Sequence, residues 1–167
     1  MNVIIEKAAA GDAAAILEYL KRIGSETDNL SFGGEGLPFS AEDEAAYISS
    51  LEGSTDGILL VAKAGGEIIA DASLSRHPRR MSHRGELGVS VVKEYWGRGI
   101  GSRLIERLLE FARENRFEII DLEVRSDNKA AIHLYEKFGF VKIGSHPEYM
   151  KIGDEYISCD YMRLVLK

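Results

Sequence analysis

One stretch of the sequence constrains the fold more than any other, because a short apolar segment, three closely spaced glycines and an amphipathic segment follow one another. The β-branched segment Leu87 to Val92 predicts a strand, and the apolar residues from Leu104 to Ala112 recur at the spacing of one helix face. Between them lie Gly97, Gly99 and Gly101. The sequence therefore predicts a strand, a glycine turn and a helix in direct succession.

The glycine turn, residues 97–102, is suited to hold an anion. Its glycines carry no Cβ atoms, so the backbone N–H groups stay uncovered at the partially positive start of the following helix. Such a turn suits a pyrophosphate, although glycine turns also join strands to helices with no ligand at all. The turn alone leaves both interpretations open.

The turn matches neither of two common nucleotide-binding motifs. The P-loop motif G-x-x-x-x-G-K-[ST] requires a lysine directly after its second glycine, where this sequence has Ser102 after Gly101. The dinucleotide-binding motif G-x-G-x-x-G requires a third glycine where this sequence has Leu104. We therefore expect neither a Walker-type nor a Rossmann-type site.

Length and composition favour one domain over residues 1–167, because 45% of the residues are hydrophobic and 29% are charged. A formal net charge of −6 argues against nucleic acid as the main partner. Cys159 is the sole cysteine, which precludes an intrachain disulfide. The sequence has neither a signal-peptide pattern nor an apolar run long enough to span a membrane, so we expect a cytoplasmic protein with no membrane partner.

Two loops carry charges that could select a substrate. Thr27 to Phe39 is long, glycine-rich and apolar in places, and Glu26, Asp28 and Glu35 add negative charge. It predicts either a movable wall for a cationic ligand or a loop that packs on the core. Arg76 to Arg84 is basic, and predicts either a solvated loop or a contact with an anionic substrate or a cofactor phosphate.

The order of the predicted elements indicates a mixed α/β sheet. Strand 118–124 should lie parallel to the strand before the glycine turn, because a helix joins the two. The last two strands predict a hairpin with a long connection. The predicted strands are Val3 to Glu6, Gly57 to Ala64, Glu67 to Leu74, Gly85 to Val92, Glu118 to Val124, Phe140 to Ile143 and about Tyr156 to Leu166; the predicted helices are Asp12 to Ile23, Ser40 to Leu51, one ending near Asn115, and Ala130 to Lys137.

The segment Val91 to Ser102, followed by Leu122 to Phe140, resembles the GCN5-related N-acetyltransferase (GNAT) superfamily. In the family's turn, written Q/R-x-x-G-x-G/A, Gly99 and Gly101 match, whereas Trp96 stands where Gln or Arg is expected. The resemblance covers nearly the whole chain. It implies a single domain of the α+β type, with a mixed, mostly antiparallel sheet of about seven strands and helices on both faces.

The resemblance also implies acetyl-CoA as co-substrate, and direct transfer of its acetyl group to a primary amine in a ternary complex. Backbone N–H groups of the glycine turn would hold the pyrophosphate, the pantetheine arm would lie beside the preceding strand, and an N–H group near Val91 would polarise the thioester carbonyl. The implied cofactor-binding residues are Val89, Val91, Val92, Gly97, Arg98, Gly99, Ile100, Gly101, Ser102 and Asn128.

Tyr135 is the implied acid. It follows Asn128 by seven residues, the spacing at which family members carry a cofactor-binding Asn and a Tyr that protonates the departing CoA thiolate. A thiolate whose acid form has a pKa of about 8.5 readily takes a proton from a nearby phenol. An aromatic residue on a short amphipathic helix is also commonly a core residue.

The amine must lose a proton before it attacks, and two glutamates match positions used as bases in different family branches. Glu86 lies on the strand leading into the glycine turn, and Glu123 lies on the next strand. Both could be ordinary strand-end charges, and we prefer Glu86 slightly. The four histidines show no metal-ligand spacing, so we expect no metal.

Other interpretations stay open from sequence alone. The chain could be a CoA-binding sensor or a non-catalytic GNAT-like subunit, or it could transfer a longer acyl group. The acceptor could be a small molecule or a protein N-terminus. The closing strands, residues 140–166, offer apolar edges through which family members often form homodimers.

Overall fold

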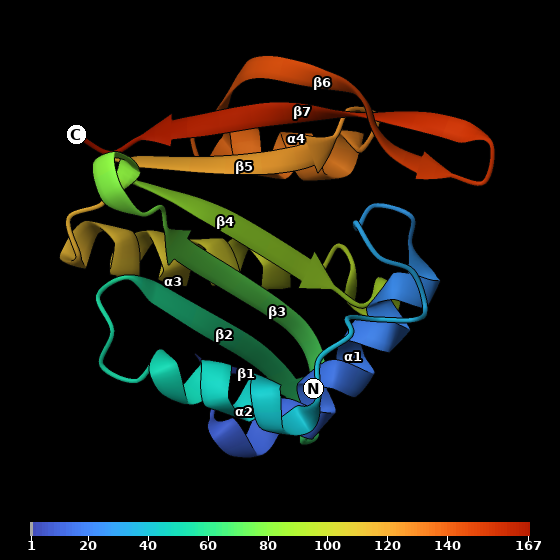
Figure 1. The fold of residues 1–167 in the computed structure, drawn as a ribbon, viewed down its shortest axis with the longest axis vertical. Helices are drawn as coiled ribbons and strands as arrows, with labels where there is room; N and C mark the ends of the chain where they lie inside the picture. The colour runs from blue at the N-terminus through green and yellow to red at the C-terminus, as the bar shows by residue number, and fades with distance from the viewer. Residues whose placement is uncertain (1) are drawn as a thin grey trace.

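The computed structural model describes residues 2–167, whose strands form one seven-stranded sheet in the order β1-β2-β3-β4-β5-β7-β6 (Figure 1). Neighbouring strands are antiparallel, except that β4 and β5 are parallel. The strands are β1 (Val3–Lys7), β2 (Gly57–Ala64), β3 (Glu67–Arg76), β4 (Arg84–Val91), β5 (Ile119–Arg125), β6 (Val141–Ile152) and β7 (Glu155–Val165). This mixed, mostly antiparallel sheet confirms the predicted fold class. The domain predicted over residues 1–167 includes residue 1, which lies outside the described residues.

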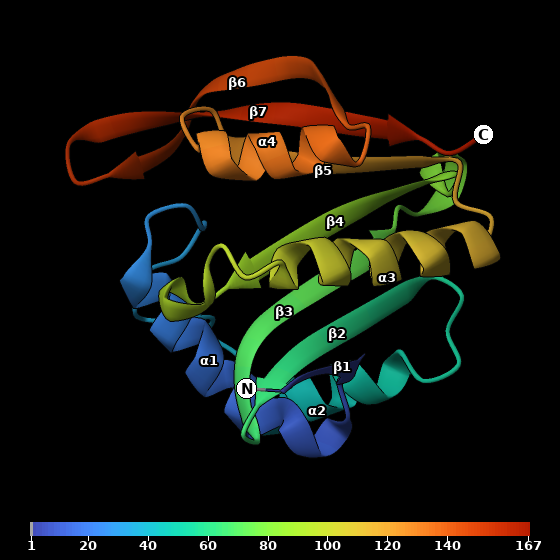
Figure 2. The ribbon, with the colours of Figure 1, turned by 180° about the vertical axis from the view of Figure 1, so that it is seen from behind.

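Helices cover both faces of the sheet. Figures 1 and 2 show α1 and α2 on one face, and α3 and α4 on the other. The helices are α1 (Ala13–Glu26), α2 (Ala41–Ser50), α3 (Ile100–Glu114) and α4 (Lys129–Lys137), with short 3-10 turns η1 (Ala10–Asp12), η2 (Arg79–Met81) and η3 (Lys93–Tyr95). No helix within residues 2–167 combines the length and apolarity needed to cross a membrane.

The core forms where apolar helix faces meet the central strands. Leu60, Val61 and Ala62 on β2 have no exposed surface, because helices cover both sides of this strand. On α3, Leu104, Ile105 and other residues at helical spacing are equally buried. Each such large apolar side chain contributes about 1.5–3 kcal/mol when it leaves water. This packing fixes α3 against the sheet and thereby fixes the turn from which α3 starts.

The hairpin between β2 and β3 follows its predicted turn. Gly65 and Gly66 both have positive φ angles, 59° and 85°, which a two-residue type I′ turn requires. The turn places Ala64 opposite Glu67, and a register shift between Ala62 and Lys63 then places Val61 opposite Asp71.

The predicted end of the chain needs one correction. The strand expected at Phe140 to Ile143 is β6, which extends to Ile152, and a tight turn at residues 153–154 replaces the long connection. The prediction was wrong because β6 is irregular. Its register with β7 shifts between Lys142 and Gly144 and between His146 and Met150, so its side chains do not alternate between the two faces as a regular strand requires.

β4 and β5 pair at one end and then diverge. Their parallel register joins Arg84 with Ile119, Gly85 with Ile120, and Glu86 with Asp121. Beyond this point Figure 1 shows the two strands running apart. The remainder of β4 therefore has a backbone edge that faces a gap rather than a hydrogen-bonded strand.

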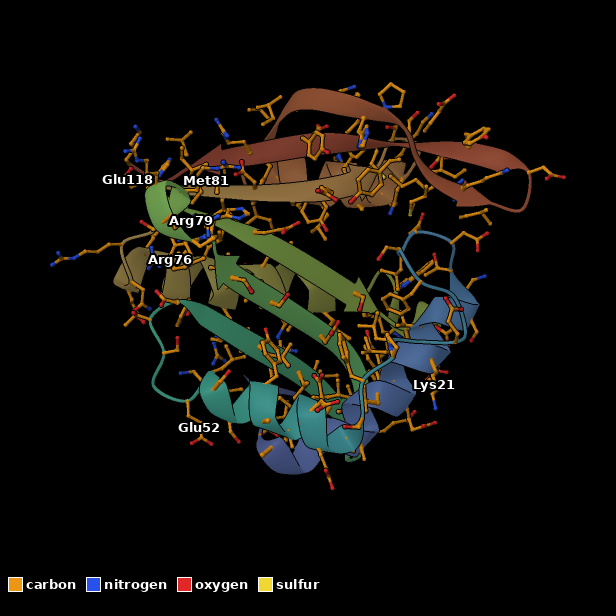
Figure 3. The ribbon with its side chains drawn as sticks, in the orientation of Figure 1. Lys21, Glu52, Arg76, Arg79, Met81 and Glu118 are labelled. Atoms are coloured by element: carbon orange, nitrogen blue, oxygen red, sulfur yellow. The ribbon has the colours of Figure 1, made fainter. Side chains whose placement is uncertain are left out.

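The basic segment lies at the closed end of the β4–β5 pair. Figure 3 shows Arg76, Arg79, Met81 and Glu118 together there, whereas Lys21 on α1 lies on the other side of the molecule. Arg76 bonds the Asp56 carboxylate at 2.9 Å and three backbone carbonyls, and its guanidinium lies 3.9 Å from the centre of the Phe117 ring. These contacts give Arg76 a structural role.

Gly24→Ala should destabilise the protein, although alanine is preferred over glycine inside a helix by about 1 kcal/mol. An ideal Cβ at Gly24 would lie 2.0 Å from the Gly33 carbonyl oxygen in the loop between α1 and α2. Relieving this overlap should cost about 1–3 kcal/mol and lower the melting temperature. Gly11→Ala is the control, because its Cβ would meet no described atom within 4 Å. A melting temperature for Gly24→Ala at or above that of the parent protein would contradict this packing.

Candidate active site

A cavity of about 600 Å³ opens where β4 has left β5. It is bounded by the end of β4, the glycine turn, the start of α3, one face of α4 and the loop after α1. The residues lining it are Ile23, Thr27, Asn29, Leu30, Val89, Ser90, Val91, Tyr95, Trp96, Gly97, Gly99, Ile100, Gly101, Ser102, Asn128, Ala130, Ala131, Leu134, Tyr135 and Lys137.

The cavity brings together most of the residues expected at the site. Those that line it are Val89, Val91, Gly97, Gly99, Ile100, Gly101, Ser102, Asn128 and Tyr135. Within the described chain, four expected residues lie outside its lining: Val92, Arg98, Glu86 and Glu123.

The glycine turn has the backbone of an anion site. Gly97 and Gly99 have φ angles of 72° and 76°, and Gly99 caps α3 in the left-handed region, which favours glycine. The Arg103 N–H donates to the Gly99 carbonyl, so the N–H groups of Ile100 to Ser102 precede the first helical bond. These donors, at the positive end of a helix dipole, fit a pyrophosphate.

Trp96, which stands where the family motif has Gln or Arg, contacts the end of β4. Its indole Nε1–H donates a 2.7 Å hydrogen bond to the Val91 carbonyl, and its ring lines the cavity. The bond ties the last residue of β4 to the start of the glycine turn. Trp96 thus lines the cavity, although the sequence marked it only as a departure from the family motif.

The backbone groups of Val91, the last residue of β4, and of Val92, which follows it, point in different directions. The Val92 N–H donates to the Ile69 carbonyl at 2.9 Å, and the Val92 side chain is fully buried. Because hydrogen-bonding direction alternates along a strand, the Val91 N–H faces the gap beside β5. Val91, rather than Val92, therefore offers a donor to a ligand in the cavity.

Asn128 and Tyr135 lie on one side of the cavity, on α4. The Asn128 side-chain oxygen accepts from the Ala131 N–H at 3.3 Å and caps the helix. Tyr135 is largely buried, with its ring 5.9 Å from that of Phe140 in an edge-on arrangement. Burial raises the pKa of Tyr135 to about 12, so its phenol stays protonated at neutral pH.

The two glutamates expected as bases are exposed. Glu86 lies opposite Asp121 in the closed part of the β4–β5 pair. Glu123, on β5, accepts a hydrogen bond from the Tyr149 phenol.

The loop after α1 forms one wall of the cavity through Thr27, Asn29 and Leu30. Of the three acidic residues in and beside this loop, Glu26, the last residue of α1, forms an ion pair. Glu26 accepts from Arg22 at 2.9 Å and from the Lys93 N–H at 2.8 Å, so it holds the loop to the end of β4.

Sequence reasoning missed a polar residue, Ser90, that lines the cavity from β4. The Ser90 hydroxyl donates to the Asp71 carboxylate at 2.5 Å and lies 2.7 Å from the Tyr19 hydroxyl. One signal was available: Asp71 interrupts the apolar run of β3, where a charged residue is costly.

Comparison with known proteins identifies the family of this chain. The family model described as the acetyltransferase (GNAT) family matches residues 25–140, which span the loop after α1, the glycine turn and α4. The chain belongs to the GNAT family. A GNAT-family acetyltransferase from Streptococcus pneumoniae has the same fold, with a TM-score of 0.94, 30% sequence identity, and coverage of 99% of this chain and 100% of that chain.

Two curated relatives are similar over part of their length. N-alpha-acetyltransferase RimI of Mycobacterium tuberculosis is 39% identical over 92 residues, which are 54% of this chain and 56% of that protein. L-amino acid N-acetyltransferase AaaT of Escherichia coli is 33% identical over 110 residues, covering 64% and 67% respectively. This GNAT chain thus spans little more than half of the RimI protein that it matches.

Gly99→Ala should weaken CoA binding about tenfold or more, because an L residue resists the left-handed conformation that aims the turn's N–H groups. Gly53→Ala is the matched control. Gly53 also has a positive φ, 65°, and open space around it, but it lies in the turn before β2. Both changes should lower the melting temperature, whereas only Gly99→Ala should raise the dissociation constant for CoA in calorimetry. Equal affinity in the two variants would argue against a role for the glycine turn.

Proposed function

We propose that this protein transfers the acetyl group of acetyl-CoA to a primary amine, by direct attack in a ternary complex. One observation carries the proposal: a single cavity joins an anion-binding turn, the open edge of β4 and the protonated phenol of Tyr135. Membership of the GNAT family supports the same activity.

The residues present fit the co-substrate. The N–H groups of Ile100, Gly101 and Ser102 would hold the pyrophosphate, and the backbone of Val89 and Val91 would bind the amides of the pantetheine arm. Acetyl-CoA, when bound, supplies an activated thioester that a neutral amine can attack. The Val91 N–H would stabilise negative charge on the attacked carbonyl oxygen.

Tyr135 would donate the proton that the departing thiolate needs. Its raised pKa keeps the phenol protonated across the neutral range, and its position in the cavity wall brings it to the ligand. Glu86 and Glu123 stay predictions for the general base.

The acceptor is proposed from the relatives. RimI is named an N-alpha-acetyltransferase and AaaT an L-amino acid N-acetyltransferase, so we propose an α-amino group, on a free amino acid or a protein N-terminus. The loop that lines the cavity through Thr27, Asn29 and Leu30 would contact it. The homodimer through β6 and β7 stays a prediction.

Tyr135→Phe should lower kcat about 10²-fold or more while leaving the dissociation constant of CoA nearly unchanged, because only the proton donor is lost. Release of free thiol from acetyl-CoA, measured over a panel of amino acids and short peptides, gives the rate. Tyr156→Phe, at an exposed tyrosine on β7, is the control.

Three results would count against the proposal. Tight CoA binding by the parent protein with no turnover on any amine would favour a sensor or non-catalytic subunit. Full activity of Tyr135→Phe would remove the tyrosine from the mechanism. Preferred use of succinyl-CoA over acetyl-CoA would change the assigned acyl group.

A further inference from the structure

Three polar side chains from three elements meet on the face of the sheet that α1 and α2 cover. Tyr19 comes from α1, Asp71 from β3 and Ser90 from β4, where Asp71 and Ser90 are direct partners in the antiparallel register. Ser90 lies at the centre: its Oγ is 2.5 Å from the Asp71 Oδ1 and 2.7 Å from the Tyr19 hydroxyl oxygen. Long-range packing therefore builds this cluster.

The direction of each hydrogen bond follows from the chemistry of the groups. An ionised carboxylate can only accept, so Ser90 donates its single proton to Asp71. Tyr19 must then donate to Ser90. A hydroxyl oxygen has two lone pairs, and Tyr19 occupies one of them. The second lone pair of Ser90 is available to an N–H donor.

Ser90 is the member of the cluster that reaches the ligand cavity. It lines the cavity between Val89 and Val91, next to the backbone edge proposed to hold the pantetheine arm. The loop residues Thr27, Asn29 and Leu30 line the same cavity. An amine that contacts this loop and approaches the thioester would therefore pass Ser90.

The surroundings of Asp71 keep it unusually basic. Burial, together with the nearby carboxylate of Glu44 on α2, raises the pKa of Asp71 to about 6, although the hydrogen bond from Ser90 opposes the shift. Burial also raises the pKa of Glu44. From α1, Tyr19 faces the cluster and Glu26 adds negative charge near it; from β2, the register partner of Asp71 is the apolar Val61.

We propose that Ser90 and Asp71 form the proton-accepting relay for the incoming ammonium group, in place of either glutamate expected from the sequence. This inference rests on the proposed acetyl transfer. Ser90 would touch the substrate, and Asp71 would act through it. Tyr19 would position the Ser90 hydroxyl.

Every proton that the relay moves, and every bond that forms or breaks, has a donor and an acceptor among these groups. The ammonium gives one N–H proton to Ser90 Oγ as Ser90 passes its own proton to Asp71, which leaves a neutral amine and a protonated carboxyl. The amine nitrogen then forms the C–N bond, the C–S bond breaks, and Tyr135 protonates the thiolate. Asp71 later returns its proton through Ser90 to water, and Tyr135 regains one as the amide nitrogen loses its second proton.

Asp71→Asn gives the sharpest test, because asparagine keeps the shape of the aspartate side chain and one oxygen that can accept a hydrogen bond from Ser90. With a short-peptide acceptor, kcat/KM should fall about 10²-fold at pH 7. The defect should shrink towards pH 9.5, since an α-amino group with a pKa of about 8 is then already neutral and needs no base. A defect of the same size at every pH would show that Asp71 is merely structural.

Glu44→Gln separates the relay from folding effects. In the parent enzyme kcat/KM should rise with pH through about 6, as Asp71 becomes ionised. Removing the Glu44 charge should lower the pKa of Asp71, so the rise in kcat/KM should move to lower pH. Glu42→Gln is the matched control, because Glu42 is solvent-exposed on the same helix. No shift in Glu44→Gln would count against Asp71 as the titrating group.

Protein stability gives a readout that needs no acetyl-CoA. Because the pKa of Asp71 is raised from 3.8 to about 6, the folded state binds more protons than the unfolded state between these values. The parent protein should therefore lose stability, relative to Asp71→Asn, as the pH rises from 4 to 7. A melting-temperature difference that does not change with pH would overturn the assignment.

The outcomes distinguish this relay from the proposed function. No turnover by the parent protein on any amine would contradict the proposed acetyl transfer itself. Normal turnover, with a pH-dependent defect that appears in Glu86→Gln or Glu123→Gln instead of Asp71→Asn, would leave the acetyl transfer intact and overturn the relay. Ser90→Ala should reproduce the defect of Asp71→Asn, and parent-like activity in Ser90→Ala would also overturn it.

Discussion

The divergence of β4 and β5 is the constraint on which the rest of the site depends. Asp121 fixes the closed end: its carboxylate accepts from Arg84 at 2.7 Å and from Arg163 at 3.0 Å, which ties β5 to β4 on one side and to β7 on the other. Beyond Glu86 the strands separate. A single parallel pair that opens in this way leaves part of a central strand with exposed backbone donors and acceptors, inside an otherwise complete sheet.

The surrounding elements cover the gap without filling it. α3 follows β4 after η3 and the glycine turn, and its buried apolar face holds it, so its N-terminal N–H groups are fixed at one margin of the gap. α4 brings Tyr135 to another margin. Arg125, at the far end of β5, donates to the Asp28 carbonyl at 3.3 Å and so holds the loop after α1 across the open end. The cavity is thus a consequence of the divergence of β4 and β5 within the sheet.

Much of this fold could be predicted from sequence, because the signals were local. The Gly65–Gly66 hairpin, the apolar face of α3 and the helix cap at Asn128 each depend on residues a few positions apart. The length of β6 could not be predicted, since its register shifts hide the alternation that marks a strand. The departure at Trp96 was visible, but its bond to the Val91 carbonyl was not.

The polar cluster at Ser90 escaped prediction for a different reason. Tyr19, Asp71 and Ser90 are far apart in sequence and become neighbours only when α1 packs on β3 and β4. A buried aspartate in an apolar strand indicates that a partner exists, but it does not say which residue that partner is. The glutamates were easier to see in the sequence, and both prove to be exposed.

A crystal structure with acetyl-CoA bound would decide whether the open edge of β4 is the binding site. The pyrophosphate should accept hydrogen bonds from the N–H groups of Ile100 to Ser102, the pantetheine amides should pair with the backbone of Val89 and Val91, and the thioester should lie within reach of both Tyr135 and Ser90. A cofactor bound outside the gap, or a thioester remote from Tyr135, would contradict this account.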